Sequence, residues 1–238
     1  MISALIIIIS LGRSCDNDNK PIKTTTKSKK NRADSEIVAK SDDWPDSIYE
    51  IMNDTPYLSQ RERGVIIEYN KCRTNPSRYA REYLTPFLNS INTDGTYKSS
   101  SGQLYTSKEG RSVIKEAIAE LDTMHPLSML RPQKYLHQAA KYHCKDTGPK
   151  GKVGHDGTDG SSPTDRGKIF NPDCIGVAES ISYGFRDPQD IMIQLLVDDG
   201  VPSRGHRRGV FFKQISHIGT SIQKHKKYGY MCVVDCGY

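Results

Sequence analysis

The sequence predicts a mixed α+β domain, with helices early in the chain and antiparallel strands at its end. Apolar residues such as Val65 and Tyr69 recur at helical spacing until Pro76 ends the helix. Residues 217–222 and 230–236 have strand-like patterns on either side of a Lys/His-rich turn, so they pair directly as a hairpin. A glycine-rich middle separates the two parts. This order is typical of an α+β domain.

Further helices are predicted between these two parts. They are residues 77–84, a helix after a capping box of Thr106 and Glu109, residues 132–146, and a helix opened by Asp187 and Pro188. The polar residues 89–105 are rich in glycine and serine and predict a surface excursion, with a small hairpin around Asp94 and Gly95.

The length and composition predict one domain with an extension. The chain has 238 residues, of which 35% are hydrophobic, enough for a core of roughly 150 to 200 residues. Residues 16–46 are mainly Lys, Asp, Asn, Ser and Thr and cannot bury enough apolar surface to offset ordering. We therefore expect a disordered charged linker over residues 16–56 and a folded domain over residues 57–238.

An aliphatic run at residues 4–11 predicts export. It is too short to span a bilayer, which takes about 20 residues, and matches the core of a secretory signal. Cys15 follows the run, as a lipidated cysteine follows the signal of bacterial lipoproteins, although ordinary cleavage nearby is the alternative. We expect residues 1–15 to direct the protein to secretion or to the outer face of a membrane.

Five cysteines lie in or near the predicted domain: Cys72, Cys144, Cys174, Cys232 and Cys236. An exported domain favours disulfides, and an odd number leaves one thiol free or joined to another chain. Cys232 and Cys236 are poor partners for each other, because four residues of strand separate their Cα atoms by roughly 13 Å.

Several function classes are disfavoured. The formal charge is +6, but basic residues are scattered among acidic ones instead of forming a stripe, so we expect no nucleic-acid partner. The chain has no P-loop or dinucleotide fingerprint. No nucleophile elbow surrounds Ser161, Ser162 or Ser203.

Two histidines and two acids are the candidate site. Val177, Glu179 and Ile181 lie on one face of a predicted strand. If that face is buried, the Glu179 carboxylate is buried too and needs a partner. His155, His206 and Glu179, with Asp198 or Asp199 as a candidate second acid, suit zinc or a similar divalent ion. Spacing alone favours the alternative, a hydrogen-bonded polar cluster without a metal.

The ordered set of motifs resembles the CAP superfamily of cysteine-rich secretory and pathogenesis-related proteins, especially its microbial secreted members. The matching stretches are Glu68 to Pro76, Leu136 to His155, Gly176 to Ile181, Val197 to Arg208, and Met231 to Asp235. Together they span roughly Ser59 to Tyr238.

This resemblance implies a three-layer α-β-α sandwich with a central antiparallel sheet. It also implies a cleft with two histidines and two acids that binds zinc in some members. His155 and His206 match the histidines, and Glu179 matches the first acid. Asp198 stands where the family usually has Glu, one methylene longer.

The leading functional expectation is a secreted or membrane-tethered binding module whose cleft holds a divalent ion or a small ligand. The resemblance adds lipids and sterols as ligands, with no residue assigned to them. One alternative is a metal-assisted hydrolase in which Glu179 acts as base. Another is an adhesive surface protein that does not use the cleft.

Overall fold

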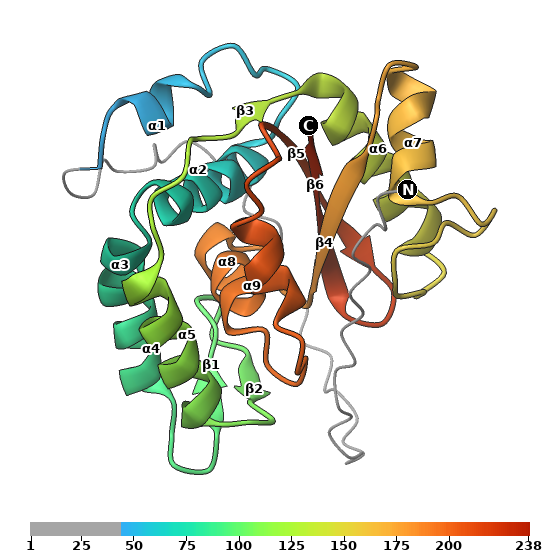
Figure 1. Cartoon of the computed structure of the whole chain (residues 1–238). Coiled ribbons are helices and arrows are strands. Elements are labelled where there is room, and N and C mark those ends of the chain that lie inside the picture. The colour runs from blue at the N-terminus through green and yellow to red at the C-terminus, as the bar shows by residue number, and fades with distance from the viewer. Residues whose placement is uncertain (1–43) are drawn as a thin grey trace, which may run out of the picture.

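The computed structural model describes residues 44–238 and centres on a four-stranded sheet with the order β3-β5-β6-β4 (Figure 1). The strands are β3 (Arg131–Pro132), β4 (Val177–Tyr183), β5 (His217–His225) and β6 (Gly229–Gly237). β5 and β6 form the predicted antiparallel hairpin, and β4 pairs antiparallel with β6. The short β3 is parallel to β5, because a helix-containing segment and not a tight turn connects them.

Helices cover both faces of this sheet, so the predicted α+β fold is confirmed (Figure 1). One face packs against α6 (Lys134–Thr147) and α7 (Pro163–Phe170). The other packs against α2 (Gln60–Thr74), α8 (Pro188–Val197) and α9 (Gly205–Val210).

A further group of short elements packs against α8. It comprises α3 (Pro76–Tyr79), the π-helical turn η1 (Ala80–Leu84), α4 (Thr85–Ser90), β1 (Thr96–Lys98), β2 (Leu104–Thr106) and α5 (Arg111–Thr123). The strands β1 and β2 form the hairpin that the polar segment predicted, with its turn at residues 99–103 and not at Asp94 and Gly95.

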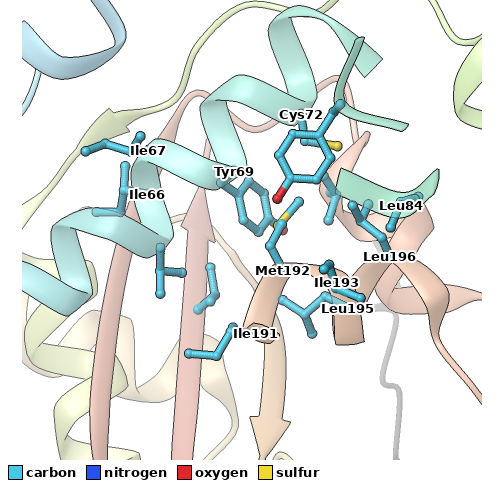
Figure 2. Close-up of a cluster of buried hydrophobic side chains, with 14 of the residues drawn as sticks. Ile66, Ile67, Tyr69, Cys72, Leu84, Ile191, Met192, Ile193, Leu195 and Leu196 are labelled. Carbon is cyan, nitrogen blue, oxygen red and sulfur yellow. The ribbon is translucent and has the colours of Figure 1, made fainter. Parts of the chain in front are cut away.

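The largest core lies between α2 and α8. Figure 2 shows Tyr69 of α2 next to Met192 of α8, with Ile66 and Leu196 in the same cluster, and all four side chains are buried. Ser59 caps α2 by accepting a hydrogen bond from the backbone N–H of Glu62, whose side chain accepts from Ser59 in return. This capping box fixes where α2 begins.

The capping box predicted for Thr106 and Glu109 does not form. Thr106 belongs to β2, and α5 begins at Arg111 after Gly110, whose φ of 62° suits a glycine. The Glu109 carboxylate forms an ion pair with Arg204, 2.7 Å away. This long-range ion pair takes the place of the local hydrogen bond that the capping box predicted. A capping box that we did not predict, Ser162 with Asp165, starts α7.

The folded domain begins earlier than the predicted boundary at residue 57. Residues 44–56 include α1 (Ser47–Glu50), and Trp44, Ile48 and Met52 are buried in the main core. These apolar side chains are spaced four apart, which favours packing of one helical face. The predicted export segment at residues 1–15, including Cys15, and linker residues 16–43 lie outside the described residues.

Within residues 44–238, no helix is both long enough and apolar enough to cross a membrane.

The expected disulfides are absent from this part of the chain. Cys72, Cys144, Cys174, Cys232 and Cys236 are all free thiols with buried side chains. The Cys144 thiol donates to the carbonyl of Ser221, and Cys232 lies 3.3 Å from the Thr220 hydroxyl. Each thiol packs as a small apolar group, so the disulfide prediction is wrong for these five residues.

Candidate functional site

The first histidine of the candidate site is held by a buried charge cluster. His155 lies in the loop before α7, and its Nδ1 is 2.8 Å from Oε1 of Glu179 on β4. Arg166 of α7 donates to Oε2 of Glu179 at 2.7 Å and to the carbonyl of His155 at 2.9 Å. All three side chains are at most 2% exposed. Both oxygens of Glu179 are therefore engaged.

The charges around Glu179 decide its protonation. Burial alone would raise its pKa, but the hydrogen bond from His155 and the positive charge of Arg166 outweigh burial and hold the pKa below its usual value. Glu179 is thus a carboxylate. Burial lowers the pKa of His143, whose Nε2 lies 2.9 Å from the carbonyl of Gly154. His143 therefore favours the neutral form, which suits its site beside Arg166.

A second buried acid lies opposite Glu179. Asp235 on β6 is the direct cross-strand partner of Glu179, and neither of its oxygens has a hydrogen-bond partner among residues 44–238. Burial, followed by the charge of Glu179, raises the pKa of Asp235 well above its usual value. Asp235 is therefore the group that carries a proton in this cluster.

The second histidine is held by the end of α8. Asp198 caps α8 in the left-handed conformation, with φ of 54°. Its Oδ2 accepts the backbone N–H of His206 at 2.8 Å, and its Oδ1 lies 2.6 Å from Nδ1 of His206. The shorter aspartate thus reaches both groups of one residue. The Nε2 atom of His206 is buried and has no hydrogen-bond partner in the described chain.

Arginines on both sides of His206 fix α9 against α5. Arg204 forms ion pairs with Glu109 at 2.7 Å and Glu116 at 2.9 Å. Arg207, which is fully buried, pairs with Glu116 at 2.8 Å and Glu120 at 2.9 Å. These contacts orient the short α9, which has too few residues to be stable alone.

The four predicted residues are brought together as two pairs. Glu179 points to the sheet face covered by α6 and α7, because it shares a side of β4 with Ile181, which packs on Ala140 of α6. Asp198 and His206 belong to the end of α8 and to α9, on the other side of the sheet. Within residues 44–238, no three His, Cys, Asp or Glu side chains are grouped to hold a metal ion.

This arrangement does not fit one ion held directly by all four side chains. The oxygens of Glu179 and Asp198 are taken up by His155, Arg166 and His206. The carboxylates instead hold Nδ1 of each imidazole. For His206 this leaves Nε2 as the atom that can meet a ligand.

Sequence reasoning missed Arg166 and Asp235. Asp235 had a usable signal, since it alternates with Met231 and Val233 on the inner side of β6, and both are buried. The signal for Arg166 was weaker: the residue lies in the first turn of a helix capped by Ser162. Its role depends on contacts with a distant strand, which spacing along the chain does not reveal.

The fold and the paired imidazoles and carboxylates define a small α-β-α domain with two buried histidine–acid pairs. The model of the cysteine-rich secretory protein family, or CAP, matches residues 68–236, and the chain belongs to this family. The resemblance of the motifs is therefore confirmed.

One similar solved structure is that of an outer surface protein from Borrelia burgdorferi. It is 22% identical, with a TM-score of 0.41, and the alignment covers 55% of this chain and 92% of that protein. No curated protein sequence matches this chain.

Proposed function

We propose that this protein is a secreted or surface-held CAP binding module in which Nε2 of His206 binds the ligand and Asp198 orients the imidazole. The observation that carries the proposal is Nε2 of His206, which is buried without a partner in the described chain. A buried imidazole nitrogen in that state needs a partner such as an ion, a water or a ligand atom. Family membership supports the extracellular setting.

Zinc is the ligand that this chemistry fits best. A carboxylate on Nδ1 fixes the tautomer of the imidazole and raises the basicity of Nε2, as in many zinc sites. In this proposal Asp198 supports the imidazole of His206 and does not touch the ion. The pair of His155 and Glu179 lies on the other side of the sheet and does not hold this ion. With few protein ligands, the ion completes its coordination with water or with a bound small molecule.

The test is a zinc titration by calorimetry, on protein purified without chelators or added metal. We expect wild-type protein to bind zinc, His206→Ala to lose binding, and Asp198→Asn to weaken it by about 10- to 100-fold. His125→Ala removes an exposed histidine outside the pairs and is the matched control. The proposal fails if wild-type protein takes up no zinc, or if His206→Ala leaves binding unchanged.

The hydrolase alternative has less support. A general base needs access to substrate and a pKa near the working pH, whereas Glu179 is 1% exposed, is bound at both oxygens, and has a lowered pKa. A screen of peptide and ester substrates with and without chelator separates the two functions. Chelator-sensitive turnover that is lost in His206→Ala would favour the hydrolase.

Lipid or sterol binding rests on family membership alone. An adhesive role predicts that replacing His155, Glu179, Asp198 and His206 leaves attachment to a partner intact. Mass spectrometry of the mature N-terminus tests whether Cys15 is lipidated and hence how the module is held at a membrane.

A further inference from the structure

A cavity lies between α8 and the β1–β2 hairpin, with α4 and α5 beside it. Its volume is about 60 Å³, small compared with the roughly 300–1,000 Å³ of sites for drug-sized ligands. It therefore suits a compact chemical group and not a sterol ring system. None of the residues proposed above to bind zinc lines it.

Aromatic rings form one wall of this cavity. Tyr97 of β1 and Tyr105 of β2 are stacked with ring centroids 5.7 Å apart. Phe87 of α4 meets Tyr97 edge-on at 5.0 Å, and Phe185 lies 4.5 Å from Tyr105. The hydroxyl of Tyr105 donates to the carbonyl of Gly184, which fixes the ring. The wall is thus continuous and preorganised.

Two carboxylates complete the lining. Asp190 of α8 accepts hydrogen bonds from the backbone N–H and the hydroxyl of Ser100, at 3.0 and 2.6 Å. Asp199 accepts the backbone N–H groups of Lys108 and Glu109, at 2.7 and 2.9 Å. All these donors are neutral, and neither acid forms an ion pair within residues 44–238.

The charge of this lining is negative, since no lysine or arginine is among the side chains that form it. Burial raises the pKa of Asp190, so its charge is incompletely stabilised in the free protein. The faces of aromatic rings attract cations, and rings combined with carboxylates form the sites that recognise quaternary ammonium groups. A neutral apolar ligand would bring no positive charge to either carboxylate.

We propose that this cavity binds a small organic cation, a quaternary ammonium group, between the aromatic wall of Tyr97 and Tyr105 and the carboxylates of Asp190 and Asp199. The site is independent of the two histidine–acid pairs. The group can belong to a soluble amine or to the head group of a choline lipid.

The first experiment compares two isosteric probes by calorimetry, choline and the neutral 3,3-dimethylbutan-1-ol. The two differ only in the charged nitrogen, so their difference in affinity measures recognition of the charge. We expect choline to bind roughly 3- to 30-fold more tightly. Equal affinity, or no binding of choline at millimolar concentration, overturns the proposal.

Variants locate the binding. Asp190→Asn removes the charge but keeps an oxygen that can accept both bonds from Ser100, and Tyr105→Leu removes a ring that Tyr105→Phe keeps. We expect Asp190→Asn and Tyr105→Leu to weaken choline binding about 2- to 30-fold. Tyr105→Phe, which keeps the ring and loses only the bond to Gly184, should bind more tightly than Tyr105→Leu. The control Tyr142→Leu on α6 should bind as wild type does. Unchanged binding in both Asp190→Asn and Tyr105→Leu contradicts the proposal even if choline binds elsewhere.

A vesicle arm identifies the source of the cation. Binding to phosphatidylcholine vesicles but not to phosphatidylglycerol vesicles, weakened in Asp190→Asn, supports a lipid head group. Binding of free choline alone supports a soluble amine. Zinc in the histidine site should not change either result, so this proposal and the proposed function can fail separately.

Discussion

Glu179 on β4 and Asp235 on β6 are direct partners across the two strands, so two buried carboxyl groups lie side by side on the sheet face covered by α6 and α7. Only Glu179 is paired with Arg166 and His155. Two adjacent carboxyl groups in a low dielectric cannot both ionise easily, and the pair divides into one carboxylate and one carboxylic acid. This division makes the two residues respond to pH with opposite signs.

Asp235→Asn should stabilise the protein at neutral pH by about 1–3 kcal/mol. Because the folded pKa of Asp235 is raised, the native state binds more protons than the unfolded state above the ordinary value of 3.8. Wild-type protein therefore loses this contribution to stability as the pH rises from about 3.8 toward the folded pKa. In urea unfolding, the free energy of unfolding of the variant should rise relative to that of wild type between pH 4 and pH 8. Asp173→Asn, at an exposed position, is the control. A variant that is less stable than wild type at every pH would contradict this prediction, because it would mean that the Asp235 carboxyl makes a contact that the amide does not replace.

Glu179→Gln should destabilise the protein by about 3–5 kcal/mol, since it leaves Arg166 buried without its partner. The pKa of Glu179 is lowered, so its contribution is present above the ordinary value of 4.5 and is lost as the pH falls through the folded pKa. The variant should lack that acid-dependent loss. Lys150→Met, which breaks an exposed pair with Asp146, should cost at most about 1 kcal/mol. Similar losses of unfolding free energy in the two variants would refute this prediction, because the buried cluster would then stabilise the protein no more than a surface ion pair does.

The sequence predicted Glu179 as a buried acid because strand alternation is local information. The same rule applies to Asp235, but its partner lies on another strand, and the significance of the residue appears only in the register of β4 with β6. Asp198 was predicted as a site acid, but its place as the left-handed residue that ends α8 was not predicted. Periodicity does not reveal where a helix stops.

The fold class was predictable and the boundaries and ligand geometry were not. Trp44 and Ile48 are two apolar residues within a polar stretch, and composition averages hide them until their core partners are known. The four site residues were identified from motifs, yet their grouping into two pairs depends on which side of the sheet each element packs. That choice is a property of the tertiary structure.

The five described cysteines should be inert in the folded protein. Burial raises the pKa of Cys232 and of Cys236 to about 12, and thiolates are the reactive form. In a Cys15→Ser variant, we expect a thiol reagent to label none of them without denaturant and all of them with it. Dithiothreitol should leave the melting temperature unchanged. A drop in melting temperature on reduction would be evidence against this prediction, because it would mean that two of these cysteines form a disulfide.

Trp44 should report whether residues 44–56 unfold together with the domain. Its indole N–H donates to Glu82 at 3.1 Å, the Arg78 guanidinium lies 4.4 Å from its ring centre, and its side chain is in the main core. Since it is the single tryptophan of the chain, its fluorescence should shift in the same urea transition as the far-ultraviolet circular dichroism. Trp44→Ala should cost about 3–5 kcal/mol, whereas Val153→Ala at an exposed position should cost under about 0.5 kcal/mol. A fluorescence transition at lower urea would mean that this segment is only loosely attached, and Trp44→Ala should then leave the main transition unchanged.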